Sequence, residues 1–284
     1  MSLRLDSEKR PFIELSDGSR IHCFGDISEE MRSRKGECRE FIEMQFQEVV
    51  VQCLKVGYDV STYRKLVLAS LRYSQYDVPK AVRKIVHSAN TIRKYKLYRH
   101  FDEVRHVFDE GLVWYLPVRG VDDSVGIVLE SGKTWNTDKV SLLDLWEAVK
   151  FANQAVLNDE RVHFGGVKLI IDFDGLAWNH VWMYTSLSAK VVFELQHCRI
   201  VDTTVHVVNN SSLFSKGHAL LTPLLGKELT SRLFLHGRNW SSLHQHISAS
   251  CLPPKYGGSA VDYDHQLMGA LLDQMKSTFP VFKP

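Results

Sequence analysis

Short hydrophobic runs alternate with amphipathic segments between Gly165 and Gly258, and this alternation is the feature that most constrains the fold. Residues 169–171 (Leu-Ile-Ile) form a continuous apolar run, which is typical of a strand covered on both faces of a sheet. Two further runs, at 205–208 and 233–235, each follow a segment with helical spacing. Strands that alternate with helices predict an α/β fold whose sheet is parallel or mixed and joined by right-handed crossovers.

Composition divides the chain into four regions. Residues 106–260 contain the alternation and are expected to form the α/β domain. Residues 28–105 predict a helical bundle, and residues 261–284 predict a C-terminal helix with a loose tail. Residues 1–27 are mixed and predict either a hairpin or a disordered arm. The expected fold is therefore a helical bundle followed by an α/β domain.

The secondary structure is predicted from periodicity and from capping residues. The clearest helix starts after Asp77, a good N-cap residue, with Pro79 where the first turn tolerates proline. The expected helices are Ser28–Leu54, Ser61–Tyr73, Val78–Arg99, Ser141–Leu157 and Asp264–Lys276. Further strands are expected at Leu112–Val118 and Val125–Leu129.

Composition is typical of a globular protein and gives no support for a nucleic-acid surface. The 284 residues are 44% hydrophobic and 24% charged, with a formal net charge of only +2. The N-terminal sequence lacks the apolar core of a signal peptide, and no stretch approaches the roughly 18 apolar residues of a membrane span. The five cysteines form no Cys-x-x-Cys pair, as expected of reduced thiols. We therefore expect a monomeric, cytoplasmic protein.

Side chains capable of chemistry are present but form no catalytic pattern. Asp172 and Asp174 end a predicted strand, where α/β enzymes often place functional groups, but the second is followed by glycine and also fits a turn. His244 and His246 are two positions apart, so on a helix they point in different directions and form no zinc pair. The sequence has no Gly-x-Ser-x-Gly, Walker or Gly-x-Gly-x-x-Gly motif. It predicts no enzyme, no metal and no cofactor; a hydrolase using Asp172, Asp174 or His236 is the minor alternative.

A basic run lies on the helix predicted to begin at Val78, with two tyrosines among its cations. The run comprises Arg83, Lys84, Arg93, Lys94, Tyr95, Lys96, Tyr98 and Arg99. Such a run is usually the solvated face of a helix. Contact with an anionic membrane or with a partner is the alternative.

The segment from Leu213 to Leu229 is strongly apolar but interrupted. Its apolar face consists of Leu213, Phe214, Leu220, Leu221, Leu224 and Leu225. Gly217, Pro223 and Gly226 interrupt the helical pattern. Two interpretations stay open: a packed core helix, or a mobile lid over an apolar cavity, since glycine and proline permit hinge motion.

Several motifs resemble, in order and spacing, those of the CRAL-TRIO family. Residues 68–81 resemble its helical N-terminal signature, and residues 165–175 resemble its strand ending in Asp-Gly. Residues 205–209 (Val-His-Val-Val-Asn) are similar to its Ile-His-Phe-Ile-Asn strand. The closing His-Gly and Leu-Pro-x-x-Tyr-Gly-Gly motifs are matched by residues 235–237 and 252–258. The resemblance covers about residues 60–260. It is strongest to the animal branch that contains cellular retinaldehyde-binding protein and α-tocopherol transfer protein.

The resemblance implies binding and transfer of one small hydrophobic ligand, such as a retinoid or a tocopherol, by a protein that is peripheral at membranes. The mostly parallel sheet would form the floor of an apolar pocket, and residues 213–229 would be its gate helix. The implied pocket residues are Leu169, Ile171, Trp182, Tyr184, Leu187, Ser188, Val191, Leu195, Val205, Val207, Phe214, Leu221 and Leu225. The implied gate or membrane contacts are Leu213, Lys216, Leu220, Leu224, Lys227 and Arg232.

The chain departs from the family pattern at positions that concern phosphoinositides. Arg232 matches a basic position of tocopherol-transfer relatives, but Val201, Thr203 and Glu228 stand where those relatives carry Lys or Arg. A phosphoinositide partner is therefore left open, as is the identity of the ligand. A membrane-recruited signalling or scaffolding module without transfer activity is the alternative function.

Overall fold

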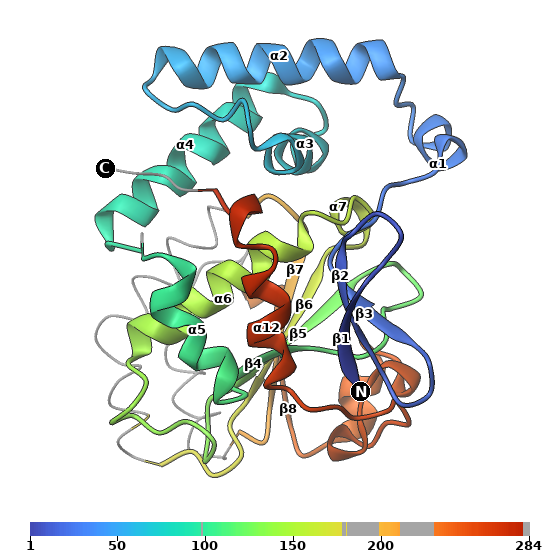
Figure 1. Ribbon diagram of the computed structural model, residues 1–284, viewed down its shortest axis with the longest axis vertical. Coiled ribbons are helices and arrows are strands. Elements are labelled where there is room, and N and C mark those ends of the chain that lie inside the picture. Colours follow the sequence, from blue (N-terminus) through green and yellow to red (C-terminus); the bar gives the residue numbers. More distant parts are fainter. Residues whose placement is uncertain (98, 178–179, 181–198, 211–229, 281–284) are drawn as a thin grey trace.

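The computed structural model shows a helical upper part and an α/β lower part (Figure 1) and describes residues 1–97, 99–177, 180, 199–210 and 230–280. The lower part is built around a five-stranded sheet in the order β4-β5-β6-β7-β8. β4 is antiparallel to β5, and β5 to β8 are parallel to one another. The strands are β4 (Val113–Tyr115), β5 (Val125–Glu130), β6 (Val167–Asp172), β7 (Thr203–Val208) and β8 (Leu233–Gly237). The predicted α/β fold with a mostly parallel sheet is confirmed.

Three helices pack against the β4 side of this sheet. They are α5 (Phe101–Asp109), α6 (Leu142–Val156) and α12 (Leu267–Asp273), and α6 also contacts β5. α6 begins at a capping box: Ser141 Oγ accepts a hydrogen bond from the Asp144 N–H at 3.2 Å, and the Asp144 carboxylate accepts one from the Ser141 N–H at 2.9 Å. The helix predicted at Ser141–Leu157 is thereby confirmed.

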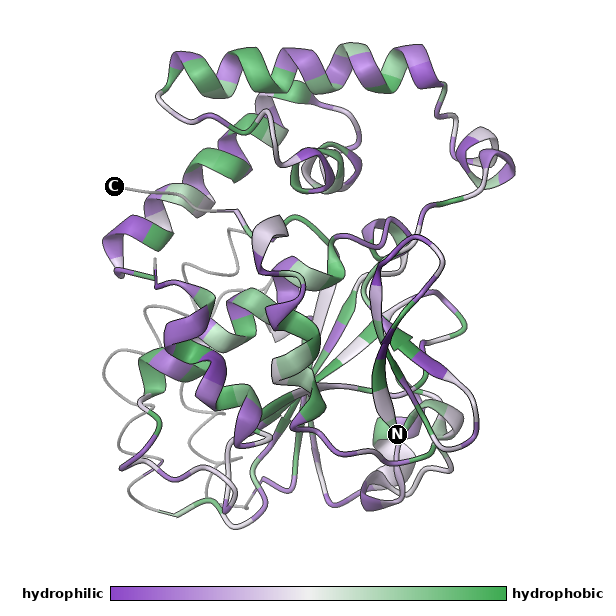
Figure 2. Ribbon diagram, viewed as in Figure 1, coloured by the Kyte–Doolittle hydropathy of each residue, from purple (hydrophilic) through white to green (hydrophobic). Residues whose placement is uncertain are grey.

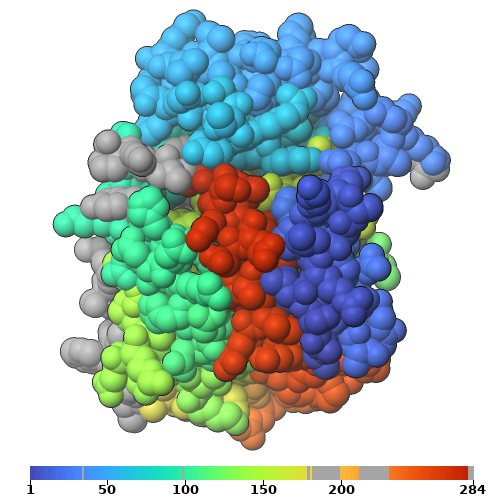
Figure 3. Space-filling model, in the orientation of Figure 1, coloured from blue at the N-terminus to red at the C-terminus, as the bar shows by residue number. Residues whose placement is uncertain are grey.

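The helix α5 is absent from the sequence predictions and crosses the boundary expected between residues 105 and 106. Its buried residues Phe101, Val104, Val107 and Phe108 recur at helical spacing, so the periodic signal was present. In the space-filling view, the C-terminal segment (red) lies between α5 (green) and the N-terminal strands (dark blue) (Figure 3).

The N-terminal residues form a separate antiparallel sheet that packs on α12. Its strands are β1 (Ser2–Leu5), β2 (Pro11–Glu14) and β3 (Arg20–His22). The turn between β2 and β3 has Gly18 at a φ of +81° and an Asp17 carboxylate that accepts the Ser19 N–H at 2.9 Å. Of the two alternatives expected for residues 1–27, the described structure has the hairpin, formed by β2 and β3, with β1 added as a third strand.

The upper part consists of four helices, of which α2, α3 and α4 enclose an apolar core of their own. They are α1 (Glu29–Arg34), α2 (Arg39–Lys55), α3 (Arg64–Tyr73) and α4 (Val78–Lys94). The single helix predicted at Ser28–Leu54 was wrong, because the chain breaks between α1 and α2 at Gly36, whose φ is +72°. The predicted cap of α4 is confirmed: the Asp77 carboxylate accepts the Lys80 N–H at 2.8 Å.

A buried ionic network joins the upper part to the lower part. Arg72 in α3, with only 1% of its side chain exposed, donates from Nε and Nη2 to the two carboxylate oxygens of Glu37 at 2.7 and 2.8 Å. It also donates to Glu160 at 3.0 Å and to His163 Nδ1 at 2.7 Å. Burial opposes the charge of Glu160, but Lys65 at 2.7 Å and Arg72 hold its pKa down to about 2. The network therefore depends on mutual compensation of buried charges.

The remaining short elements follow or connect the main strands. They are α7 (Val162–Gly165), α11 (Trp240–His244), η2 (Ala249–Cys251), η3 (Pro254–Tyr256) and η4 (Lys276–Thr278). α7 packs against α3 beside the ionic network, and α11 packs against β8.

Candidate functional site

Two rows of mostly aliphatic side chains cross the sheet on the face that α6 covers. The strand register aligns Tyr115, Ile127, Leu169, Val205 and Leu233 in one row, and Val113, Leu129, Ile171, Val207 and Leu235 in the other. Because alternate side chains along a strand point to the same face, both rows share one face. Tyr115 identifies it, since its hydroxyl donates to the Ala152 carbonyl of α6 at 2.8 Å.

The cover over these rows decreases from β4 toward β8. In the first row, Tyr115 and Ile127 are 2% and 0% exposed, whereas Val205 and Leu233 are partly exposed. In the second row, Ile171 and Leu235 are partly exposed, although Val207 is buried. We call the six residues contributed by β6, β7 and β8 the aliphatic floor: Leu169, Ile171, Val205, Val207, Leu233 and Leu235.

Four residues of the predicted pocket belong to the aliphatic floor: Leu169, Ile171, Val205 and Val207. The register sets Leu169 beside Val205 and Ile171 beside Val207. The sequence prediction missed Leu233 and Leu235, which extend the same rows onto β8. Their alternation with Phe234 and His236 is the period-two pattern that identifies one face of a strand.

The other predicted pocket and gate residues lie outside the described residues. They are Trp182, Tyr184, Leu187, Ser188, Val191 and Leu195, and then Leu213, Phe214, Lys216, Leu220, Leu221, Leu224, Leu225 and Lys227. Their assignment remains a prediction from the sequence.

Arg232 is the described member of the predicted membrane contacts. It immediately precedes β8, is partly exposed, and forms an ion pair with Asp202, which precedes β7. The cation therefore lies at the amino ends of the parallel strands, next in the chain to Leu233 of the aliphatic floor. Val201 is buried and Thr203 is partly buried. Of positions 201, 203 and 232, which were compared above with basic positions of relatives, only 232 carries a cation in this chain.

The opposite face of β7 and β8 carries a hydrogen-bonded chain of hydroxyl and imidazole groups. Thr204 Oγ1 lies 2.9 Å from His206 Nε2, His206 Nδ1 lies 3.1 Å from His236 Nε2, and His236 Nδ1 lies 2.8 Å from Ser242 Oγ. Burial, together with the charge of neighbouring histidines, lowers the pKa of His206 to about 3 and that of His236 to about 4. Both rings are neutral near pH 7, and their bonds link β7, β8 and α11.

Asp172, the last residue of β6, and Asp174, two residues later, are held by neighbouring side chains. Asp172 accepts hydrogen bonds from Asn209 Nδ2 at 2.7 Å and from the Tyr256 hydroxyl at 3.0 Å. Asp174 forms an ion pair with Lys133 at 2.5 Å, and this hydrogen bond lowers the pKa of the carboxyl. Through these contacts Asp172 joins the end of β6 to the residue after β7 and to η3, and Asp174 joins the segment after β6 to the segment after β5.

A polar cleft of about 720 Å³ lies at the same edge of the sheet. Glu130 at the end of β5 accepts a hydrogen bond from Trp114 Nε1 at 3.2 Å and is paired with Lys255. Burial raises the pKa of Glu130 in spite of Lys255. Lys255 also lies 3.6 Å from Asp172, so it is shared between two buried carboxylates. The cleft is lined by charges that compensate one another.

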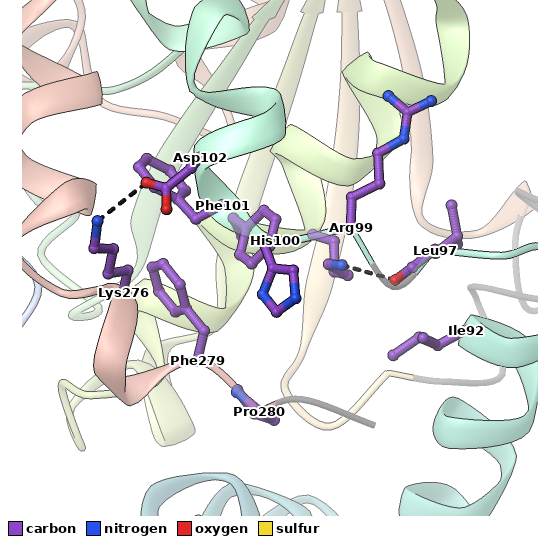
Figure 4. A pocket seen from close by; sticks show the side chains of 11 residues that line it. Ile92, Leu97, Arg99, His100, Phe101, Asp102, Lys276, Phe279 and Pro280 are labelled. Carbon is purple, nitrogen blue, oxygen red and sulfur yellow. Dashed lines mark hydrogen bonds and ion pairs between the residues drawn. The ribbon is translucent and has the colours of Figure 1, made fainter. Parts of the chain in front are cut away.

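A smaller cavity of about 120 Å³ lies where the end of α4 meets α5, α6 and η4 (Figure 4). Phe101, Phe151 and Phe279 contribute apolar walls, and Lys276 at its rim is paired with Asp102 at 3.0 Å. This volume is well below the roughly 300–1,000 Å³ of a typical small-molecule pocket. It is too small for a lipid, and the aliphatic floor is the stronger candidate for a ligand site.

Within the described residues, no helix is long and apolar enough to cross a membrane. The same part of the chain contains no group of three or more His, Cys, Asp or Glu side chains arranged to hold a metal ion.

Comparison with known proteins gives one family match that covers most of the α/β part. The CRAL/TRIO domain model matches residues 109–258. This range contains all five strands of the large sheet, the aliphatic floor, the hydrogen-bonded chain from Thr204 to Ser242, and Asp172 and Asp174 with their partners.

Several curated relatives match the same part of the chain. Clavesin-1 of Xenopus laevis is 29% identical over 140 residues, which cover 49% of this chain and 42% of that protein. Human alpha-tocopherol transfer protein-like is 26% identical over 140 residues, covering 49% and 41%. Human clavesin-2 is 28% identical over 132 residues, covering 46% and 40%. The match thus spans less than half the length of these relatives.

Among solved structures, the crystal structure of Sfh5 aligns with 84% of this chain and 98% of its own. The TM-score is 0.44 and the sequence identity 11%, a similarity too low to add to the argument.

Proposed function

Because the chain belongs to the CRAL-TRIO family, we propose that it binds one small hydrophobic ligand on the aliphatic floor and transfers it between membranes without covalent change. The observation that carries this proposal is the apolar face of β6, β7 and β8, on which four of the six residues of the aliphatic floor are partly exposed. Sheets of this parallel type are normally covered on both faces, so an apolar row with incomplete cover is a favourable surface for an apolar ligand. The name of one relative, alpha-tocopherol transfer protein-like, agrees with a lipid as ligand.

The chemistry of the aliphatic floor favours a ligand with a long aliphatic part. Its six side chains are all Val, Leu or Ile. Three strands about 4.8 Å apart give a surface roughly 10 Å wide, enough for an acyl or isoprenoid chain. Each 100 Å² of apolar ligand surface buried there contributes about 2.5 kcal/mol. Affinity would therefore come from burial, and a few polar groups would only set the orientation of the ligand.

The remaining parts of the proposal rest on sequence. The apolar segment at 213–229 would act as the gate, because glycine and proline interrupt it. Residues 182–195 would supply a second wall of the pocket. Arg232, with Lys216 and Lys227, would contact an anionic membrane surface, including phosphoinositides, during exchange.

A single substitution in the aliphatic floor tests this proposal. Val205→Glu places a carboxylate between Leu169 and Leu233 of the aliphatic floor, at a partly exposed position. Uptake of a fluorescent NBD-labelled acyl lipid from vesicles should fall at least tenfold. Val121→Glu is the matched control, because Val121 is 99% exposed in the loop between β4 and β5. A folded Val205→Glu variant with the uptake of the control would refute the site, and the scaffolding alternative would then be favoured.

A further inference from the structure

The outward face of α2 carries an exposed apolar stripe. Met44, Val51 and Leu54 are 58%, 49% and 50% exposed. Together with the exposed Gln47 they follow one another at intervals of three, four and three residues, which keeps them on one face of a helix. α2 is the outermost helix of the upper part in Figure 1, and Figure 2 shows apolar residues all along it. We call Met44, Gln47, Val51 and Leu54 the α2 stripe.

This stripe is not a general property of the bundle, as α4 shows. Both helices have 17 residues and pack against each other. The inner face of α2 is already apolar, with Ile42, Phe46, Val49, Val50 and Cys53 buried. The exposed positions of α4, in contrast, include Lys80, Arg83, Arg93 and Lys94. α2 therefore carries, beside its buried apolar face, a narrow exposed apolar stripe bordered by charged residues, which is the arrangement of a contact surface.

The charges beside the stripe indicate what covers it. Exposed glutamates, Glu40, Glu43 and Glu48, flank it, and Lys55 lies at its C-terminal end. Glu43 is paired with Arg64 at 2.8 Å, whereas neither Glu40 nor Lys55 has an ion-pair partner among the described residues. An acidic flank disfavours an anionic membrane surface. The two ends of the stripe carry opposite charges, Glu40 at one end and Lys55 at the other. When two copies of α2 lie antiparallel, each glutamate therefore faces the lysine of the other copy.

We propose that the α2 stripe binds the α2 stripe of a second copy of this chain, with the two helices antiparallel about a twofold axis near Gln47 and Glu48. In this arrangement Met44 of each copy lies opposite Val51 of the other, and Glu40 lies opposite Lys55 at both ends. Antiparallel helices also place opposite ends of their macrodipoles together. The proposal is independent of lipid binding, because α2 lies outside the matched residues 109–258.

The size of the stripe sets the expected strength of the dimer. A 17-residue helix is about 25 Å long, and a strip about 10 Å wide along it buries well under the ~800 Å² per partner of a standard interface. The dimer is therefore weak, and the monomer expected from the sequence dominates in dilute solution. Association becomes measurable at about 10 to 500 µM chain.

Sedimentation velocity of the full chain over that concentration range tests the proposal. The sedimentation coefficient should rise with concentration toward that of a dimer. Val51→Glu should raise the dissociation constant at least tenfold, and Met44→Gln, a second variant at an exposed site, should raise it less. Val121→Glu, the same substitution at an exposed valine far along the chain, should leave it unchanged. A monomer at every concentration, or a dimer that is indifferent to Val51→Glu, would overturn the proposal.

Charge reversal separates the antiparallel pairing from other contacts. Glu40→Lys and Lys55→Glu should each weaken the dimer several-fold, because each creates two like-charge pairs, and the double variant should restore the wild-type constant. Failure of the double variant to restore association would overturn this arrangement. A membrane surface is the competing occupant of the stripe, and flotation with phosphatidylcholine vesicles tests it. If the chain stays monomeric but binds these vesicles, and Val51→Glu abolishes that binding, the stripe is a membrane contact and the dimer proposal is overturned.

Discussion

Arg72 is the side chain whose loss should weaken the junction between the helical bundle and the α/β part. Its guanidinium compensates two buried carboxylates at once, those of Glu37 and Glu160, whose side chains are 1% and 5% exposed. Arg72→Met keeps most of the aliphatic volume but removes every hydrogen bond. Glu37 then retains the Tyr76 hydroxyl as a partner, and Glu160 retains Lys65 and Arg32.

The free energy of unfolding should fall by about 3–5 kcal/mol in Arg72→Met, because removing one partner of a buried ion pair leaves an uncompensated charge. The double variant Arg72→Met/Glu37→Leu should lose less than the single variant, since it removes the stranded carboxylate as well. This non-additivity is the signature of a mutually compensated pair.

Equilibrium unfolding in urea, followed by circular dichroism, measures these losses. Amide hydrogen exchange should also show faster exchange in α3 and α4 of the single variant. A loss below about 1 kcal/mol for Arg72→Met, or a double variant that loses as much as the two single variants together, would refute the reasoning.

Two further predictions concern stability. The pKa of His206 is lowered from 6.5 to about 3 on folding, so the unfolded chain takes up a proton that the folded chain does not as pH falls below 6.5. The free energy of unfolding should therefore decrease as the pH falls from 7 toward 4. His206 alone should account for about 2 kcal/mol of this decrease between pH 7 and pH 5. Urea unfolding of His206→Gln should accordingly show a shallower pH dependence. Gly132→Ala would set a Cβ atom 1.9 Å from a backbone carbonyl oxygen, and should cost about 1–3 kcal/mol or more by thermal unfolding. A pH dependence unchanged by His206→Gln, or a Gly132→Ala variant as stable as the wild type, would count against these assignments.

The aliphatic floor was largely predictable because it depends on local pattern. Leu169, Ile171, Val205 and Val207 belong to short apolar runs, and period two assigns them to one face. β8 follows the same rule, and a strict reading of its alternation predicts Leu235 as well. What required the structure is the register, since the sequence does not say which residue of one strand lies beside which residue of the next.

Long-range contacts and helix breaks were harder to predict. Arg72 and Glu160 are 88 residues apart, and an ion pair between distant residues leaves no periodic trace. The break at Gly36 was visible as a glycine but was overridden by the helical pattern on both sides of it. The exposure of Met44 could not be inferred, because α2 has apolar residues on its exposed side as well as on its buried face, and periodicity alone does not tell which of them are covered.

Native mass spectrometry of the purified chain, before and after mixing with vesicles that contain an isotopically labelled lipid, tests the central claim most directly. The proposed function predicts one bound lipid per chain, replaced by its labelled counterpart after mixing. A chain that carries no lipid mass, or one whose bound mass never exchanges, would contradict it.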